Sequence, residues 1–369
     1  IYNHENYSQN ATVSNNYIEI NSSSSNHHYG IMVHDATVVQ DTIIMFDNSC
    51  DHRIGIEGNR NALIKDNYID IYDNGCGGQG QAIVNWCASD DRCVIEGNTI
   101  IAQGNVRGIW ASYSDIENNY LDTGDNYDHT EWGIGYSSEN VIKNNTLVGG
   151  FDSGIHIGDG HWNNTVENNT LEVDRWGIYG SNAYGTLEIH NNEVRQMGTE
   201  PDENQYWMLY IANNTDTVRV SNNTFISEDN AGVYIHDNNS TGTHLTFEDN
   251  TVDVQWNLMY IDNVMMDVRN NLLKNSSGYY GVQIQNTSGG FFWNNTIIGN
   301  SGEYGFWVDD YSNPEIVNNI VQGFDIGIKG DADLSLVSYN NFYDNTLYFT
   351  GDGLPNLFGE LYSVNNNGD

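Results

Sequence analysis

The chain has 369 residues, with 50 Asp or Glu against 12 Lys or Arg, so its formal net charge is −38. This charge argues against nucleic acid and anionic membrane as partners, because both need a basic surface. No run of about 18 apolar residues is present that could insert into a membrane, and the 12% aromatic content is too high for a disordered chain. The chain begins in a polar stretch with no signal peptide, as expected of a mature or excised segment.

A short phrase recurs along the chain: a β-branched residue, any residue, two Asn, any residue and an aliphatic residue. The first copy reads Val13-Ser14-Asn15-Asn16-Tyr17-Ile18, and a degenerate copy at 39–43 carries Asp41 in place of the second Asn. Fourteen copies follow one another with a mean step of about 25 residues. The other thirteen copies end at Asn16, Asn67, Asn98, Asn119, Asn145, Asn169, Asn192, Asn223, Asn250, Asn271, Asn295, Asn319 and Asn341.

Short alternating runs that begin with Gly, such as Gly154-Ile155-His156-Ile157, lie between these copies. Alternation bounded by turn residues predicts half-buried strands, and a repeat of 20–30 residues without helices indicates a solenoid. Asn suits the turns because it tolerates left-handed backbone angles, and stacked Asn amides can bond to one another. We therefore expect an all-β parallel β-helix of about 14 coils in one domain, residues 1–369, with repeats at 13–345 and a C-terminal cap at 346–369.

The four cysteines fall within the first coils. Cys50 and Cys76 each lie nine residues after the Asn position of their copy, so they should stack in adjacent coils within disulfide reach. Cys87 and Cys93 flank a short loop that a second disulfide could close. We predict both pairs, with four buried thiols as the alternative. Two disulfides would place the protein outside the cytoplasm, and the spacing does not suggest zinc.

In each Gly-Ile-x-Ile run the aliphatic residues should point inward and x outward. The x positions of successive coils therefore form one outward column: Met32, Glu57, Val84, Trp110, Gly135, His156, Tyr179, Tyr210, Tyr234, Tyr260, Gln283, Trp307 and Lys329. Two positions before the Ile, the residues are Arg107, Trp132, Ser153, Trp176 and Trp207. One residue earlier they are Val106, Glu131, Asp152, Arg175 and Tyr206. Carboxylates, an Arg and aromatic rings should thus lie side by side.

Three insertions leave the corner just ahead of this column, at about 73–81, 122–131 and 196–205, and would wall a cleft. Glycoside hydrolysis needs two neighbouring carboxyl groups, one as acid and one as base or nucleophile. Candidate catalytic carboxylates are Glu131, Asp152 and Asp159, with His156 and Arg175 orienting or binding substrate. Candidate substrate-binding residues are Arg107, Trp110, Trp132, Trp176, Tyr179, Tyr206, Trp207 and Tyr210. His34, His236 and Asp309 fall in the next outward column.

Structural explanations stand beside these assignments. Outward rings can simply pack on neighbouring coils, acidic side chains will meet by chance in so acidic a chain, and Asp159 lies in a Gly-Asp-Gly sequence that could be only a turn. We predict no metal centre. Ca²⁺ at acidic turns such as Asp309-Asp310 is a weaker alternative, because the spacing matches no specific loop.

The phrases Asn144-Asn145-Thr146-Leu147 and Asn168-Asn169-Thr170-Leu171, with Gly154-Ile155 and Gly177-Ile178, resemble the right-handed parallel β-helix families of carbohydrate-binding proteins and sugar hydrolases. The resemblance covers nearly the whole chain and implies a right-handed coil. The Asn-rich, acidic, Lys-poor character is similar to that of the disaggregatases of methanogenic archaea, which depolymerise methanochondroitin. That resemblance implies a uronate-binding cleft in which Arg107, Arg175 and Arg195 offset the acidic field.

These observations predict an extracellular or cell-surface enzyme that cleaves glycosidic bonds of an extended acidic polysaccharide, such as methanochondroitin, by carboxylate-based hydrolysis. A polysaccharide lyase is the first alternative. It would need a base, for which His156, Tyr179 and Arg175 are candidates, and neutralisation of the uronate by Arg or Ca²⁺. A non-catalytic surface-layer or adhesin rod is the second alternative, and the three insertions at one corner argue against it.

Overall fold

The computed structural model describes residues 11–22, 28–47, 53–73, 80–124, 130–135, 138–158, 163–182, 185–196, 206–213, 217–237, 244–277, 279–330 and 336–351, all in strands and turns. Contacts divide the chain into two compact units, Ile1–Glu188 (unit 1) and Ile189–Asp369 (unit 2), and each is described by itself. The single domain over 1–369 stays a prediction, as does the cap at 346–369, most of which lies outside the described residues.

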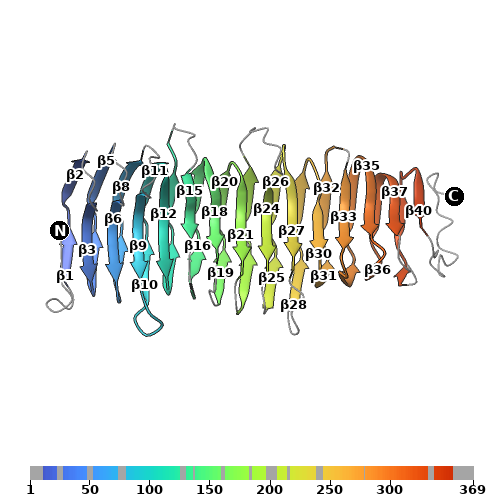
Figure 1. The fold of residues 1–369 in the computed structure, drawn as a ribbon, viewed down its shortest axis with the longest axis horizontal. Coiled ribbons are helices and arrows are strands. Elements are labelled where there is room, and N and C mark those ends of the chain that lie inside the picture. Colours follow the sequence, from blue (N-terminus) through green and yellow to red (C-terminus); the bar gives the residue numbers. More distant parts are fainter. Residues whose placement is uncertain are drawn as a thin grey trace. The chain divides into compact units, whose positions relative to one another are not determined.

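Unit 1 is built from turns of three strands each, which Figure 1 shows following one another along the unit. The first strands are β1 (Ala11–Ser14), β4 (Ala36–Val39), β7 (Leu63–Lys65), β10 (Cys93–Glu96), β13 (Ser114–Glu117), β16 (Val141–Lys143) and β19 (Asn164–Glu167). The second are β2 (Tyr17–Ser22), β5 (Thr42–Asp47), β8 (Tyr68–Asp73), β11 (Thr99–Gly104), β14 (Tyr120–Asp122), β17 (Thr146–Gly149) and β20 (Thr170–Val173). The third are β3 (His28–His34), β6 (Arg53–Asn59), β9 (Gly80–Trp86), β12 (Val106–Ser112), β15 (Thr130–Gly135), β18 (Phe151–Ile157) and β21 (Trp176–Ser181).

Unit 2 repeats this arrangement, and β22 (Leu187–His190) crosses the boundary in the sequence. Its first strands are β25 (Thr217–Ser221), β28 (His244–Glu248), β31 (Met265–Arg269), β34 (Gly289–Trp293), β36 (Asn313–Val317) and β38 (Val337–Ser338). The second are β23 (Glu193–Gln196), β26 (Thr224–Ser227), β29 (Thr251–Val254), β32 (Leu272–Asn275) and β39 (Asn341–Tyr343). The third are β24 (Trp207–Ala212), β27 (Ala231–His236), β30 (Met259–Asp262), β33 (Tyr280–Gln285) and β40 (Leu347–Thr350). In two turns the second and third strands are continuous, as β35 (Thr296–Val308) and β37 (Ile320–Gly330).

Within each unit, every strand pairs in parallel with the equivalent strand of the next turn, as β12 does with β9 and β15, and β27 with β24 and β30. This confirms the parallel β-solenoid. Twelve turns in the described residues have three separate strands, and in two more the second and third strands are continuous, as β35 and β37.

The Asn pair forms the corner between the first and second strands. Its first member adopts the left-handed conformation, with φ of 57° at Asn118 and 56° at Asn144. Its second member is buried, and the Asn119 side chain donates a 3.0 Å hydrogen bond to that of Asn145. The same side-chain bonds link Asn223 to Asn250 in unit 2, so the predicted amide ladder is confirmed in both units.

Two copies, one near each end of the chain, show which residue occupies the ladder position when the sequence departs from the phrase. Asp41 takes the place of the second Asn in the degenerate copy and accepts a 2.8 Å hydrogen bond from the Asn16 amide. The last copy lies one residue earlier than expected: Tyr339 has the positive φ of 57°, and Asn340 rather than Asn341 accepts from Asn319 at 3.0 Å. The ladder geometry, rather than the Asn-Asn letters, defines the copy.

The core of each turn is filled by the aliphatic residues of the alternating runs. Ile155 and Ile157 are fully buried while His156 between them is partly exposed, as expected from strand alternation. The glycine that precedes such a pair has a steric role: a Cβ on Gly108 would lie 2.3 Å from the Gly133 carbonyl oxygen of the next turn. Side chains are therefore excluded where consecutive turns approach most closely.

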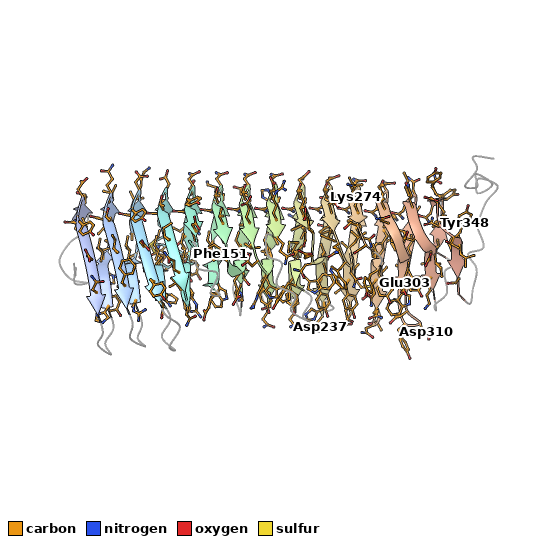
Figure 2. The ribbon with its side chains drawn as sticks, turned by 90° about the horizontal axis from the view of Figure 1, so that it is seen from above. Phe151, Asp237, Lys274, Glu303, Asp310 and Tyr348 are labelled. Atoms are coloured by element: carbon orange, nitrogen blue, oxygen red, sulfur yellow. A yellow bond between two sulfur atoms is a disulfide. The ribbon has the colours of Figure 1, made fainter. Side chains whose placement is uncertain are left out.

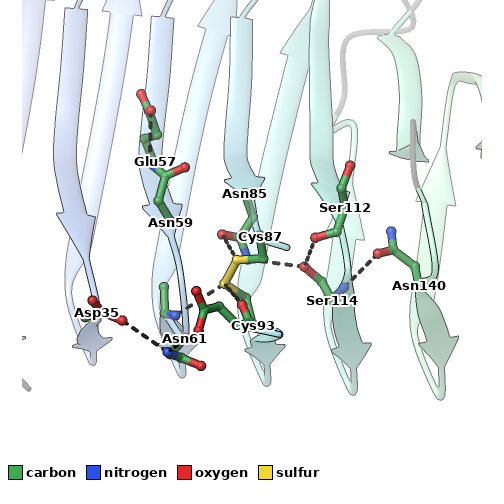
Figure 3. The surroundings of a disulfide bond; sticks show 12 residues. Asp35, Glu57, Asn59, Asn61, Asn85, Cys87, Cys93, Ser112, Ser114 and Asn140 are labelled. Carbon is green, nitrogen blue, oxygen red and sulfur yellow. Dashed lines mark hydrogen bonds between the residues drawn. A yellow bond between two sulfur atoms is a disulfide. The ribbon is translucent and has the colours of Figure 1, made fainter. Parts of the chain in front are cut away.

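A disulfide joins Cys87 and Cys93, whose Cα atoms are 6.0 Å apart (Figure 3). Both cysteines are buried with Ala62, whose backbone N–H donates to Cys93 Sγ at 3.2 Å. This predicted pair is confirmed. Cys50 and Cys76 lie outside the described residues, so their pairing stays a prediction.

Candidate active site

The outward column of unit 1 runs across the third strands in the expected register. Val84 pairs with Trp110, Trp110 with Gly135, Gly135 with His156, and His156 with Tyr179. Residues about 25 apart in sequence thus become direct neighbours. Successive residues of the column are separated by one strand spacing, about 4.8 Å.

The rings of this column and the neighbouring ring of Trp132 contact one another in series. Trp132, which lies opposite Ser153, stacks on His156 with ring centroids 4.2 Å apart, and His156 stacks on Tyr179 at 4.7 Å. Trp110 meets Trp132 edge-on at 6.0 Å. Stacking covers the ring faces, so the rings between Trp132 and Tyr179 present mainly their edges and polar atoms outward.

Trp86 extends this aromatic row and was missed by sequence reasoning. Its ring centroid lies 5.7 Å from that of Trp110, and its side chain is 45% exposed. It comes from β9, which lacks the Gly-Ile pair that marks the other third strands. The alternation of β9 places Trp86 on the outward face, two residues after Val84, and this could have been counted from the sequence. Among these rings Trp86 offers the most open face for stacking a sugar.

Arg107 lies between two of the tryptophans. Its guanidinium carbon is 4.2 Å from the centroid of Trp110 and 4.1 Å from that of Trp132. Its Nε donates to Glu131 Oε2 at 2.7 Å, and only 7% of the residue is exposed. Arg107 is therefore predominantly a buried positioning group for Glu131 and the rings.

Glu131 and Asp152 lie opposite each other on β15 and β18, because Thr130 pairs with Phe151 on one side and Trp132 with Ser153 on the other. Asp152 forms a 3.0 Å ion pair with Arg175, which directly precedes β21. The Glu131 and Asp152 side chains are 25% and 32% exposed. The predicted juxtaposition of Glu131, Asp152 and Arg175 is what the strand register produces, with Arg107 as a second guanidinium.

Several predicted site residues are not part of this group as described. Asp159 lies outside the described residues, as do most of the three insertions at 73–81, 122–131 and 196–205. Tyr206, Trp207 and Tyr210 belong to unit 2, where Tyr206 and Trp207 are 8% and 5% exposed. Trp176 lies in unit 1 and meets Tyr179 edge-on at 5.6 Å. The catalytic and binding roles of all these residues stay predictions.

The outward column of unit 2 is made of tyrosines. Tyr210 pairs with Tyr234 and Tyr234 with Tyr260, and the last two rings are stacked 4.8 Å apart with an interplanar angle of 7°. Burial is the main cause that raises the pKa of both Tyr234 and Tyr260, and nearby Asp262 adds to it. Both therefore stay protonated phenols.

His236 and Asp237 adjoin this column at the end of β27. His236 Nε2 is 2.5 Å from the Tyr210 hydroxyl oxygen, and Nδ1 is 2.9 Å from Asp237 Oδ2. Hydrogen bonds from His236 and Asn263 hold the pKa of Asp237 below its usual value. Figure 2 shows Asp237 at the edge of the unit opposite to the edge that carries Lys274. Sequence spacing places His236 in the next outward column but does not predict its contact with Tyr210, which comes from the preceding turn.

No group of three or more His, Cys, Asp or Glu side chains in the described ranges could hold a metal ion. The described part of the chain also forms no helix long and apolar enough to cross a membrane.

Comparison with known proteins supports the fold. Residues 177–367 match the family described as the right handed beta helix region, and residues 41–209 match the periplasmic copper-binding protein NosD family. No curated protein matches the chain.

Solved structures similar to the chain include the A-module of an Azotobacter vinelandii mannuronan C-5 epimerase, AlgE6, at 12% identity and a TM-score of 0.33, over 94% of this chain and 88% of that one. The catalytic domain of a GH87 α-1,3-glucanase matches at 13% identity and a TM-score of 0.36, over 94% and 64%. A tailspike protein of the Acinetobacter baumannii bacteriophage Fri1, a capsular polysaccharide depolymerase, matches at 12% identity and a TM-score of 0.36, over 88% of this chain and 57% of that one. These scores are too low to carry an argument about activity. The family match covers more than half of the residues, so the chain belongs to the right-handed β-helix family.

Proposed function

We propose that this protein is an extracellular enzyme that depolymerises an acidic polysaccharide by hydrolysing glycosidic bonds at the third strands of unit 1. One observation carries the proposal: Glu131 and Asp152 lie opposite each other on neighbouring strands, each held by a guanidinium, beside a row of aromatic rings. This combination supplies two carboxyl groups, a partly exposed cation for a uronate in Arg175, and aromatic rings for contact with sugar rings.

The spacing suits carboxylate-based hydrolysis. Neighbouring strands are about 4.8 Å apart, and the two carboxyl groups of retaining glycosidases are about 5–5.5 Å apart. Glu131 accepts a hydrogen bond from the buried Arg107, which holds its carboxylate in place as a nucleophile requires. Asp152 pairs with Arg175, which is 20% exposed and can turn toward a substrate carboxylate. That exchange would leave Asp152 without its counter-charge, favour its protonated form and make it the acid.

The rest of the site matches an extended anionic chain. Trp86 supplies an open ring at one end of the row, and the edges of Trp132, His156 and Tyr179 continue it. In a protein of net charge −38, the partly exposed guanidinium of Arg175 provides the local cation that a uronate needs.

The Cys87–Cys93 disulfide supports a location in an oxidising compartment. The resemblance to disaggregatases makes methanochondroitin the first substrate to test.

The test is release of reducing ends from methanochondroitin, chondroitin and polygalacturonate, with product masses measured in parallel. Glu131→Gln and Asp152→Asn should each lower the rate by about 10²–10⁴-fold, because an acid or nucleophile is lost. The matched control is Glu117→Gln, which removes a carboxylate paired to Lys143 at 3.2 Å on the first-strand face of the same unit and should keep the rate. Retention of activity by both site variants would rule out this site.

A further inference from the structure

Tyr210, His236 and Asp237 of unit 2 form a chain of hydrogen bonds that the unit 1 site does not use. A carboxylate can only accept, so the 2.9 Å contact with Asp237 requires the proton on His236 Nδ1. In the neutral form of the imidazole, Nε2 then accepts the hydrogen bond of the Tyr210 hydroxyl, over 2.5 Å. The Tyr210 oxygen is thereby polarised toward a phenolate.

The position of this chain is fixed by the fold. Tyr210 comes from β24 and His236 from β27, and Asn263 fixes Asp237 from the next turn through a 3.2 Å bond to Oδ1. The His236 side chain is 17% exposed, so it is largely withdrawn from water but open on one side. Such a group, oriented by a carboxylate and bonded to a hydroxyl, has the arrangement of an activated base.

A second tyrosine beside it has the opposite character. The Tyr234 ring stacks on His236 at 4.7 Å, and burial raises the pKa of Tyr234. Tyr260 donates its hydroxyl to Gln285 at 2.7 Å, whereas the Tyr234 hydroxyl makes no hydrogen bond within the described residues. Two adjacent tyrosines, one polarised by a base and one held protonated, are the pair that an acid–base reaction requires.

We propose that Tyr210, His236 and Asp237 form a proton relay that removes the proton next to the carboxylate of a hexuronate and eliminates its glycosidic bond. Tyr210 and His236 are the catalytic residues, and Asp237 is a positioning residue. Tyr234 donates a hydrogen bond to the uronate carboxylate as charge develops on it. Lys274, which pairs with Asp253 at 2.9 Å, lies on the opposite edge of the unit (Figure 2).

The reaction balances within these groups. Tyr210 gives its proton to His236 Nε2 and takes the proton from the substrate carbon that bears the carboxylate. The electron pair of that C–H bond becomes a C=C bond as the C–O bond at the adjacent carbon breaks. The leaving sugar oxygen takes the proton from His236, which restores neutral imidazole and the Tyr210 hydroxyl. No oxidant or reductant is needed.

The charged and titratable groups facing His236 among the described residues include Tyr210 from the preceding turn, Tyr234 and Asp237 from its own turn, and Asp262, its register partner, from the next. The two carboxylates stabilise the imidazolium that forms transiently. They also repel a uronate, so the hydrogen bond from Tyr234 must offset that repulsion.

The experiment uses the full chain with chondroitin, alginate and polygalacturonate as probes. The product of elimination is an unsaturated uronate, detected by its ultraviolet absorbance and by a mass one water lighter than the hydrolytic product. Tyr210→Phe and His236→Asn should each lower the rate of its formation by about 10²–10⁴-fold. Tyr304→Phe makes the same change in a ring stacked on Tyr280 elsewhere in unit 2 and should keep the rate.

Absence of unsaturated product from all three probes, or its undiminished formation by Tyr210→Phe, would overturn the relay. Denaturation midpoints of the variants equal to that of the parent protein show that a loss of rate is not a loss of folding. The hydrolytic proposal is tested separately, because Glu131→Gln should lower the release of saturated ends and leave the unsaturated product unchanged.

Discussion

The outward columns of the two units occupy the same backbone position and carry different chemistry. In unit 1 the column contains Trp110 and His156, with guanidinium–carboxylate pairs beside it. In unit 2 it contains Tyr210, Tyr234 and Tyr260, with an imidazole–carboxylate pair beside it. The repeat determines where an outward side chain lies, and the residue at each repeat determines what it can do.

The largest expected effect is the separation of the two proposed activities, hydrolysis at the column of unit 1 and elimination at the column of unit 2. Glu131→Gln should remove hydrolytic products and His236→Asn the unsaturated ones, each by about 10³-fold, which is about 4 kcal/mol of transition-state stabilisation. Product masses from one digest distinguish the two. If either variant lowers both products equally, the columns serve a single site and the contrast between units is wrong.

The amide ladder should respond alike in both units. Asn145 donates to the Asn169 side chain and the Ile116 carbonyl, and accepts from Asn119. Its removal in Asn145→Ala leaves several buried groups unpaired, at about 1 kcal/mol each, so we expect a loss of about 2–4 kcal/mol in the free energy of unfolding. Asn271→Ala, at the equivalent position of unit 2, should cost the same, as measured by urea denaturation.

Asn144→Gly is the control for the ladder. Asn144 is exposed and has a φ of 56°, a conformation that Gly adopts readily. The expected change is below about 0.5 kcal/mol. A cost equal to that of Asn145→Ala would mean that the corner, not the ladder, holds the turns together.

The two cations that lie over aromatic rings, Arg107 in unit 1 and Lys329 in unit 2, should contribute unequally to the free energy of unfolding. Arg107 is buried between two tryptophans and paired with Glu131, so Arg107→Met should cost about 2 kcal/mol through the lost cation–π contacts and the lost ion pair with Glu131. Lys329 Nζ lies 5.0 Å from the ring centroid of Tyr304 and 5.7 Å from that of Trp307, but it is not enclosed between the rings. Lys329→Met should therefore lower the free energy of unfolding by less than about 1 kcal/mol. Equal costs in thermal denaturation would contradict the difference.

The smallest effect concerns the second-strand face of unit 1. Burial raises the pKa of Asp70, and its Oδ1 is buried without a hydrogen bond among the described residues. Because the pKa of Asp70 is higher in the folded than in the unfolded protein, its ionisation favours unfolding. Stability therefore falls as the pH rises from the usual pKa of Asp through the raised pKa of the folded state. Asp70→Asn should therefore stabilise the protein slightly at neutral pH, by a few tenths of a kcal/mol after allowance for solvent screening. The gain should vanish below the usual pKa of Asp, as melting temperatures at several pH values would show.

The sequence by itself determined the solenoid, the Asn ladder and the outward column. Each depends on a repeat of about 25 residues, and a parallel stack turns sequence spacing directly into contact. That is why the Glu131–Asp152 register could be counted. The last copy was misplaced by one residue, because Asn340 and not Asn341 occupies the ladder position.

Tertiary structure alone decided how the side chains in those positions are oriented. Spacing does not say that ring faces cover one another from Trp132 to Tyr179, nor that Arg107 is buried between rings instead of facing a uronate. It also does not say that Tyr210 turns toward His236. Rotamers are chosen by the packing of neighbouring turns and by the need to satisfy buried polar groups, and both depend on contacts that exist only once the turns are stacked.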